Sequence, residues 1–107
     1  GAAAALRAAA MPGSNISAVV SRGGRPDLAG DALEQVQSPT LLIVGGNDEI
    51  VLQLNRAAFA RLPGEKKELA IVPGATHLFE EPGALEQVAY EAALWFGQYV
   101  ARSVSAH

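Results

Sequence analysis

The sequence predicts an α/β fold with about three parallel strands and flanking helices. Residues 40–44 and 68–72 form short runs bounded by loops that contain glycine and proline. The first of these runs is apolar throughout, which is typical of a strand covered on both faces. Helical segments alternate with the runs, and crossovers of this length connect parallel strands through right-handed βαβ units.

A local signal supports each element. Residues 2–11 are rich in alanine, the strongest helix former, and end at Pro12-Gly13, so they predict a helix. The β-branched segment 16–21 predicts the first strand, and residues 27–36 predict a loop or a short helix. Further helices are expected over 52–62 and over 83–103. The second of these carries apolar residues at helical spacing, namely Leu85, Val88, Ala92, Trp95, Phe96 and Tyr99.

Composition narrows the function classes. The chain has 107 residues, one domain or part of one, and its 50% apolar content is enough for a hydrophobic core. The 8 basic residues are scattered against 11 acidic ones, which disfavours a nucleic-acid partner. No segment is long and apolar enough to span a membrane, and residues 1–11 resemble a helix more than a signal peptide. Cysteine is absent, which fits a reducing compartment, so we expect a cytoplasmic location.

Two loops carry the candidate chemistry. Residues 45–51 contain Asp48 and residues 73–79 contain His77, and each loop follows a predicted strand. Open α/β sheets build their active sites beyond the carboxyl ends of their strands. An aspartate that orients a histidine makes up two thirds of a hydrolytic triad. The sequence therefore predicts that Asp48 and His77 meet in a carboxylate–imidazole hydrogen bond, or approach each other closely if the loops relax without neighbouring strands.

Each of these residues also has a structural interpretation. An aspartate after Gly-Gly-Asn is often a turn former or a helix N-cap, and a single histidine is often a hydrogen-bonded loop residue. Gly45-Gly46 lacks the spacing of a dinucleotide loop. One Asp, one Glu and one His without tight ligand spacing do not predict a metal site, so neither a metal nor a cofactor is expected.

Two arginines follow the first predicted strand, on the same edge of the sheet as the two loops. Arg22 and Arg25 flank Gly23-Gly24, and their guanidinium groups match the geometry of a substrate carboxylate or phosphate. The alternative is that they are solvated or pair with Asp27 and Asp31.

The spacing within these loops resembles that of a known family. Residues 41–51, then 74–79, then a long amphipathic helix resemble the C-terminal part of an α/β-hydrolase, most closely the dienelactone hydrolase branch. In that family the acid follows one strand in a Gly-x-x-Asp-x-x-Val setting, and the base follows the next in a Gly-x-x-His-x-Phe-like setting. The matching positions are Gly45, Asp48 and Val51 for the acid, and Gly74, His77 and Phe79 for the base.

The resemblance implies a hydrolase of ester or lactone bonds that needs no cofactor. Asp48 and His77 would be the acid and base, and the substrate would be a small-molecule ester or lactone. Phe79, together with the two arginines selected above, Arg22 and Arg25, completes the candidate substrate-binding residues. The family's Gly-x-Ser-x-Gly elbow is absent, and Gly1 looks like its last glycine, so residues 1–107 are expected to form a partial α/β-hydrolase domain that is inactive alone.

Two further expectations concern assembly and the rival function class. Segment 16–21 would be an unpaired sheet edge, so we expect either a homodimer or pairing with a chain that carries the upstream strands. The alternative to an enzyme is a non-catalytic α/β module that binds or assembles.

Overall fold

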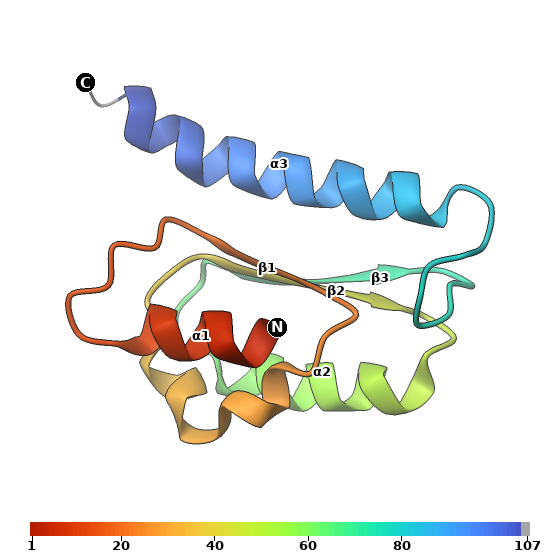
Figure 1. The fold of residues 1–107 in the computed structure, drawn as a ribbon, viewed down its shortest axis with the longest axis horizontal. Helices are drawn as coiled ribbons and strands as arrows, with labels where there is room; N and C mark the ends of the chain where they lie inside the picture. Colours follow the sequence, from red (N-terminus) through yellow and green to blue (C-terminus); the bar gives the residue numbers. More distant parts are fainter. Residues whose placement is uncertain (106–107) are drawn as a thin grey trace.

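A parallel three-stranded sheet lies between two layers of helices (Figure 1). The computed structural model describes the backbone of residues 1–105 and the side chains of residues 1–99. The elements in chain order are α1 (Ala2–Ala10), β1 (Val19–Arg22), the 3₁₀ segment η1 (Pro26–Gln35), β2 (Thr40–Gly45), α2 (Glu49–Arg61), β3 (Lys67–Val72) and α3 (Ala84–Ser105). The predicted α/β fold, its order of elements and its parallel strands are confirmed.

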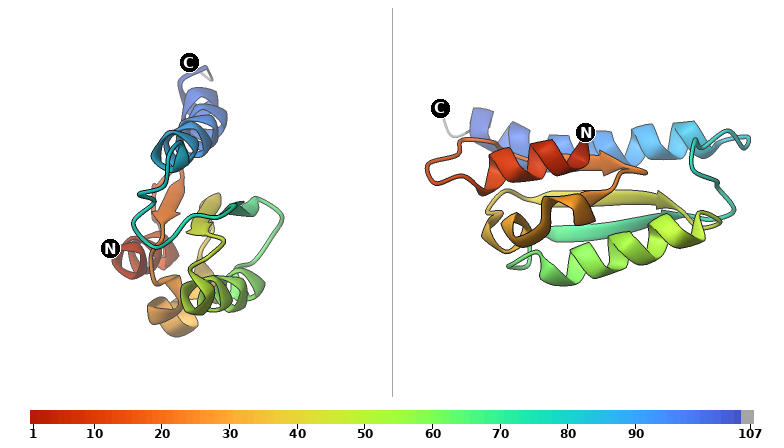
Figure 2. Two further views of the ribbon diagram at one scale, coloured as in Figure 1. Left: turned by 90° about the vertical axis from the view of Figure 1, so that its right-hand side faces the viewer. Right: turned by 60° about the horizontal axis from the view of Figure 1, so that its bottom comes forward.

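The central strand β2 divides the hydrophobic core in two. All six of its residues are buried, and successive side chains point to opposite faces of the sheet. Leu42 packs with α1, η1 and α2, whereas Leu41 and Ile43 pack with α3. The views in Figure 2 show α3 on one face and the other helices on the opposite face. The apolar run in the sequence is therefore explained by the burial of both faces of this strand.

Strand β1 is shorter at its start than the sequence predicts. Pairing begins at Val19, which is aligned with Thr40 and whose N–H donates to the carbonyl of Pro39 at 2.9 Å. Pro39 has no N–H to contribute, so the ladder between β1 and β2 cannot extend further back through it. The chain before Val19 is held instead by the Ser38 hydroxyl, which donates to the carbonyl of Ile16 at 2.8 Å.

Two other elements refine the predicted boundaries. Helix α2 begins earlier than expected, directly after Asp48, whose carbonyl accepts a hydrogen bond from the Leu52 N–H at 2.8 Å. Segment η1 is the short helix that the sequence left as one of two alternatives, and it is kinked at Gly30, where φ is 58°. No helix in the described part of the chain combines the length and apolar character required to cross a bilayer.

At the carboxyl end of β2, the backbone approaches the loop after β3 so closely that only glycine fits at position 45. A Cβ on Gly45 would overlap the carbonyl oxygen of Ala75 and would lie 2.8 Å from that of Thr76. Both neighbours are backbone atoms, which cannot rotate away as a side chain could. The absence of a side chain at Gly45 therefore sets the separation of the two loops that follow β2 and β3.

We expect Gly45→Ala to lower the free energy of unfolding by about 1–3 kcal/mol or more, as overpacking against fixed atoms does. Gly97→Ala is the matched control. Apart from the backbone of α3 itself, no atom of the described residues lies within 4 Å of a Cβ at Gly97, which is inside α3. This change should therefore raise stability by about 0.5–1 kcal/mol. Denaturant unfolding of the intact protein measures both, and equal effects of the two changes would contradict the tight approach at Gly45.

Candidate active site

The loops after β2 and β3 form one hydrogen-bonded unit. The Gly46 N–H donates to the carbonyl of Val72 at 2.9 Å, and the Asn47 N–H donates to that of Ala75 at 2.9 Å. The Asn47 side-chain amide donates to the carbonyl of Gly74 at 3.2 Å. All three bonds come from the two residues that follow Gly45, and they hold the two loops together.

This unit brings together the two residues predicted to act as acid and base. His77 Nδ1 lies 2.9 Å from Asp48 Oδ2. The Asp48 side chain is only 15% exposed, whereas that of His77 is 56% exposed. When Nδ1 donates its proton to the carboxylate, the lone pair of the neutral ring is on Nε2. The predicted hydrogen bond is confirmed; the catalytic role of the pair stays a prediction.

The His77 side chain lines a groove of about 400 Å³ between its own loop, the end of β1 and the start of α3. One cation and several apolar side chains share it. The residues that line it with His77 are Arg22, Leu78, Phe79, Leu85, Val88 and Ala89. The groove is therefore mainly apolar, with a guanidinium group and an imidazole on its lining.

Two of the three predicted substrate contacts lie on this groove. Arg22 has no hydrogen-bond or ion-pair partner among the described residues, so its charge is uncompensated there. Phe79 is only 5% exposed and packs in the core under α3, with a left-handed φ of 55°. Gly23 in the loop after β1 lies against it, since an added Cβ would be 3.2 Å from the Phe79 ring. Phe79 therefore anchors the histidine loop as well as lining the groove.

Arg25 is directed elsewhere. Its guanidinium group makes two 2.9 Å hydrogen bonds to the carboxylate of Asp27, and it does not line the groove. These bonds raise the pKa of Arg25 and lower that of Asp27. The pairing with Asp27 considered from the sequence is thus present, whereas Asp31 pairs with Arg61 at 2.8 Å.

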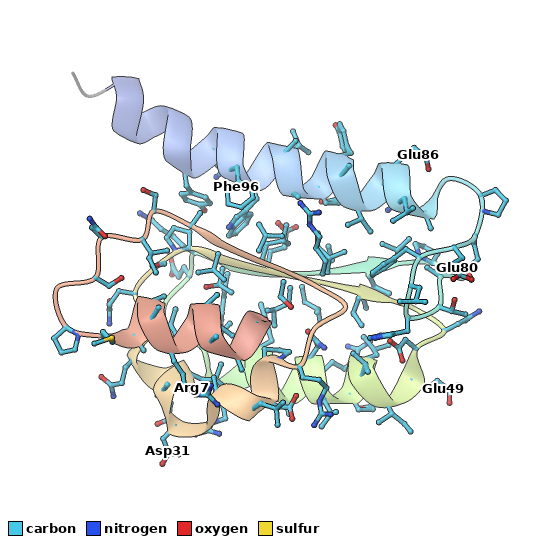
Figure 3. All side chains as sticks on the ribbon, viewed as in Figure 1. Arg7, Asp31, Glu49, Glu80, Glu86 and Phe96 are labelled. Carbon is cyan, nitrogen blue, oxygen red and sulfur yellow. The ribbon has the colours of Figure 1, made fainter. Side chains whose placement is uncertain are left out.

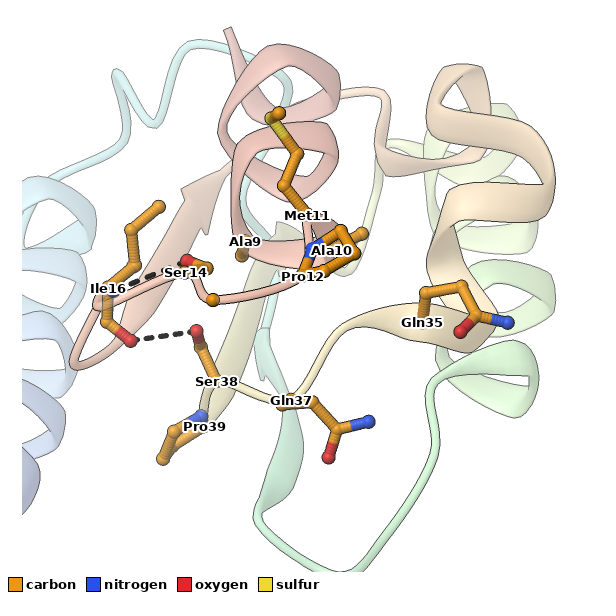
Figure 4. Close-up of a pocket in the computed structure, with 11 residues that line it drawn as sticks. Ala9, Ala10, Met11, Pro12, Ser14, Ile16, Gln35, Gln37, Ser38 and Pro39 are labelled. Carbon is orange, nitrogen blue, oxygen red and sulfur yellow. Dashed lines mark hydrogen bonds between the residues drawn. The ribbon is translucent and has the colours of Figure 1, made fainter.

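A larger cavity, of about 480 Å³, lies at the opposite end of the sheet (Figure 4). None of the side chains that line it is titratable. Both of its serine hydroxyls are engaged with Ile16, since Ser38 Oγ donates to the Ile16 carbonyl and the Ile16 N–H donates to Ser14 Oγ. The chemistry-bearing groups are instead at the carboxyl ends of the strands, so we place the candidate site there despite the smaller volume.

Glu81 is a neighbour of the site that no sequence pattern indicated. One of its carboxylate oxygens accepts the Thr76 N–H at 3.0 Å, and the other accepts the Thr76 hydroxyl at 2.7 Å. The hydroxyl donor is the larger cause of a lowered pKa for Glu81, followed by the amide donor.

Two more acids, Glu80 and Glu49 of α2, lie at the same end of the sheet (Figure 3). Across the described side chains, no three His, Cys, Asp or Glu residues are grouped as metal ligands.

Comparison with known proteins gives one structural and two sequence relatives. The crystal structure of a dienelactone hydrolase from Anabaena variabilis superimposes with a TM-score of 0.87 and 56% identity, over 92% of this chain and 45% of that one. Two proteins from Mycobacterium tuberculosis strains, CDC 1551 and H37Rv, are each 68% identical over 96 residues and are named as proposed phosphoribosyl transferases. No protein-family model matches the chain.

The share of each relative that is covered limits what these matches establish. The alignment with the two mycobacterial proteins covers 90% of this chain but only 21% of their length. The chain also spans less than half of the solved hydrolase. The fold of this chain is the α/β fold of the matching part of the dienelactone hydrolase.

The lowered pKa of Glu81 predicts a specific pH response. Because the carboxylate form accepts the two Thr76 bonds, their contribution to stability is complete above the ordinary glutamic acid pKa. It is lost only as the pH falls through the lower pKa of the folded protein. We expect the Glu81 carboxyl carbon, followed by NMR in the intact protein, to titrate below the ordinary glutamic acid range.

Thr76→Val tests the cause of that shift, since it removes the hydroxyl donor and keeps the amide donor and the shape of the side chain. The Glu81 titration should move toward its ordinary range in this variant. An unchanged titration would show that the hydroxyl is not the main cause.

Proposed function

We propose that this chain supplies the acid and the base of a hydrolase that cleaves ester or lactone bonds by a Ser-His-Asp mechanism. The observation that supports the proposal most directly is the 2.9 Å hydrogen bond between His77 and Asp48. The 56% identity with a dienelactone hydrolase gives independent support. In this proposal residues 1–107 are the acid and base portion of an α/β-hydrolase domain, and the chain by itself has no activity above background.

The proposal gives each residue of the pair a role that its geometry supports. The Asp48 carboxylate accepts a hydrogen bond from Nδ1–H and so fixes the tautomer and the ring orientation of His77. Nε2 then accepts the proton of a serine hydroxyl as the oxygen attacks the acyl carbon, and later gives that proton to the leaving group. The Asp48 carboxylate stabilises the imidazolium formed between the two steps, and no cofactor takes part.

The serine would come from an elbow whose last glycine is Gly1. The start of α1 lies beside the loop after β1, because a Cβ on Gly24 would be 2.8 Å from the Cβ of Ala2. That loop is at the same edge of the sheet as His77. A serine just before α1 would therefore lie at the edge where the proposed base is.

We also propose that the groove beside His77 binds the substrate. Apolar side chains such as Leu85 and Val88 would contact the hydrocarbon part, and the unpaired guanidinium of Arg22 would bind an anionic group. Phe79 would contribute to the lining from its buried position. The bidentate pairing of Arg25 with Asp27 gives the proposed role of Arg25 no support.

Strand β1 has a paired neighbour on one side only among the described strands. An unpaired edge offers free N–H and C=O groups to a further strand. We therefore keep the proposal that this edge pairs with a second copy of the chain or with a segment that carries the upstream strands.

A non-catalytic module that binds or assembles remains the rival class. The name shared by the two mycobacterial relatives does not decide between the classes, because the match covers only 21% of those proteins. The two classes differ in one consequence, which is whether any hydrolysis depends on Asp48 and His77.

By the intact protein we mean this chain together with the proposed upstream segment that carries the serine, and we expect it to hydrolyse a small activated ester. Asp48→Asn should reduce its kcat by about 10⁴-fold, because asparagine favours the wrong tautomer of the histidine, as in another hydrolytic triad. His77→Ala should remove most activity. Glu49→Gln is the control, since this neighbouring carboxylate is exposed on the first turn of α2. Wild-type hydrolysis by both site variants would favour the binding module.

Substrate charge tests the groove. In the intact protein, Arg22→Gln should raise KM for an ester that carries a carboxylate by about 10- to 100-fold, the range for losing a charged hydrogen bond. A neutral ester of the same size should be unaffected, and Arg25→Gln should change neither. Equal effects of Arg22→Gln on the charged and the neutral ester would contradict anion binding by this residue.

A further inference from the structure

The loop that carries His77 is long, and the hydrogen bonds from the neighbouring loop reach only its first residues. It runs from residue 73 to residue 83, between β3 and α3. The bonds from Asn47 reach Gly74 and Ala75, which precede His77. The hydrogen bond to Asp48 fixes one ring nitrogen, yet a ring on a loose backbone can still move Nε2.

Glu81 closes the far side of this loop. Its two carboxylate oxygens each accept one hydrogen bond from Thr76, the residue directly before His77. Within the loop that this closes, the Phe79 N–H donates to the Thr76 carbonyl at 3.1 Å. Thr76 therefore has its N–H, hydroxyl and carbonyl all engaged, so the residue that precedes His77 is held by two backbone groups and its side chain.

The continuation of the chain is fixed as well. The Glu81 carbonyl accepts the Ala84 N–H at 3.0 Å, which ties the loop to the start of α3. Phe79 is buried in the core below. His77 thus lies between a buried anchor and a carboxylate clamp, and its exposed ring has no other described hydrogen-bond partner than Asp48.

We propose that Glu81, acting through Thr76, is a positioning residue that holds the His77 imidazole in line with the nucleophile. Glu81 does not touch the reacting atoms. Its carboxylate fixes the backbone at Thr76, and the backbone fixes the direction of the imidazole. The inference rests on the proposed hydrolase function for its kinetic consequence, but not for its structural one.

The test compares two adjacent acids in the intact protein. Glu81→Ala removes the clamp, whereas Glu80→Ala removes a carboxylate of equal charge that has no hydrogen-bond partner among the described residues. We expect Glu81→Ala to lower kcat for ester hydrolysis by up to about 100-fold with KM little changed, since small displacements of a reacting group have effects of this size. Glu80→Ala should match the wild type.

A spectroscopic measurement separates positioning from general stability. The proton on Nδ1 of His77, shared with Asp48, should give a downfield NMR resonance protected from exchange in the wild type. In Glu81→Ala it should broaden and exchange faster. Thr76→Val should weaken it as well, and Thr76→Ser, which keeps both donors, should restore it. These Thr76 variants keep the test available if Glu81→Ala fails to fold.

The two proposals fail in different ways. If His77→Ala does not lower hydrolysis, the proposed function fails, and the His77 resonance still decides the role of Glu81. If hydrolysis does depend on His77, an unchanged kcat in Glu81→Ala overturns the inference. A His77 resonance that is the same in Glu81→Ala and Glu80→Ala overturns it in either case.

Discussion

The contact between Gly45 and the backbone of Ala75 and Thr76 is the constraint on which the candidate site depends. Strands in a sheet place their ends about 4.8 Å apart, but the loops beyond them are free to diverge. Here the lack of a side chain at Gly45 lets the loop after β3 cross directly over the end of β2. Bonds from Gly46 and Asn47 then join the loops, and Asp48 and His77 are left within hydrogen-bond distance.

The same contact explains why both halves of the core matter to the site. Strand β2 contributes Leu42 to one core and Leu41 and Ile43 to the other, and it ends at Gly45. A cavity in either core would therefore loosen the packing of β2, the strand that positions the acid. The hydrogen bond between Asp48 and His77 is exposed on the His77 side, so it contributes little to the stability of the fold. The packing of the two cores positions this pair, rather than the reverse.

Much of this arrangement could be predicted from the sequence because the relevant patterns are local. The apolar run at 40–44 predicted a strand buried on both faces, and the loops that contain Asp48 and His77 placed both residues at one edge. The start of β1 could not be predicted, since it depends on where Pro39 interrupts a partner strand. The clamp made by Glu81 was also missed, because a glutamate five residues after a threonine bonds back to it only when the intervening chain turns. The buried position of Phe79 depends on its positive φ, which cannot be predicted from a phenylalanine in the sequence.

The two halves of the site differ in how much change their connections can absorb. The acid lies in the short connection 46–48, whose every residue bonds to a neighbouring strand or loop, so an insertion there would break the site. The base lies in the connection 73–83, which has surface on one side and is the longer of the two. Loops of this kind accept insertions and substitutions more readily than the elements they join. Divergence among related proteins should therefore accumulate on the histidine side, and the reach of the imidazole, rather than the place of the carboxylate, is the part of this architecture that evolution can adjust.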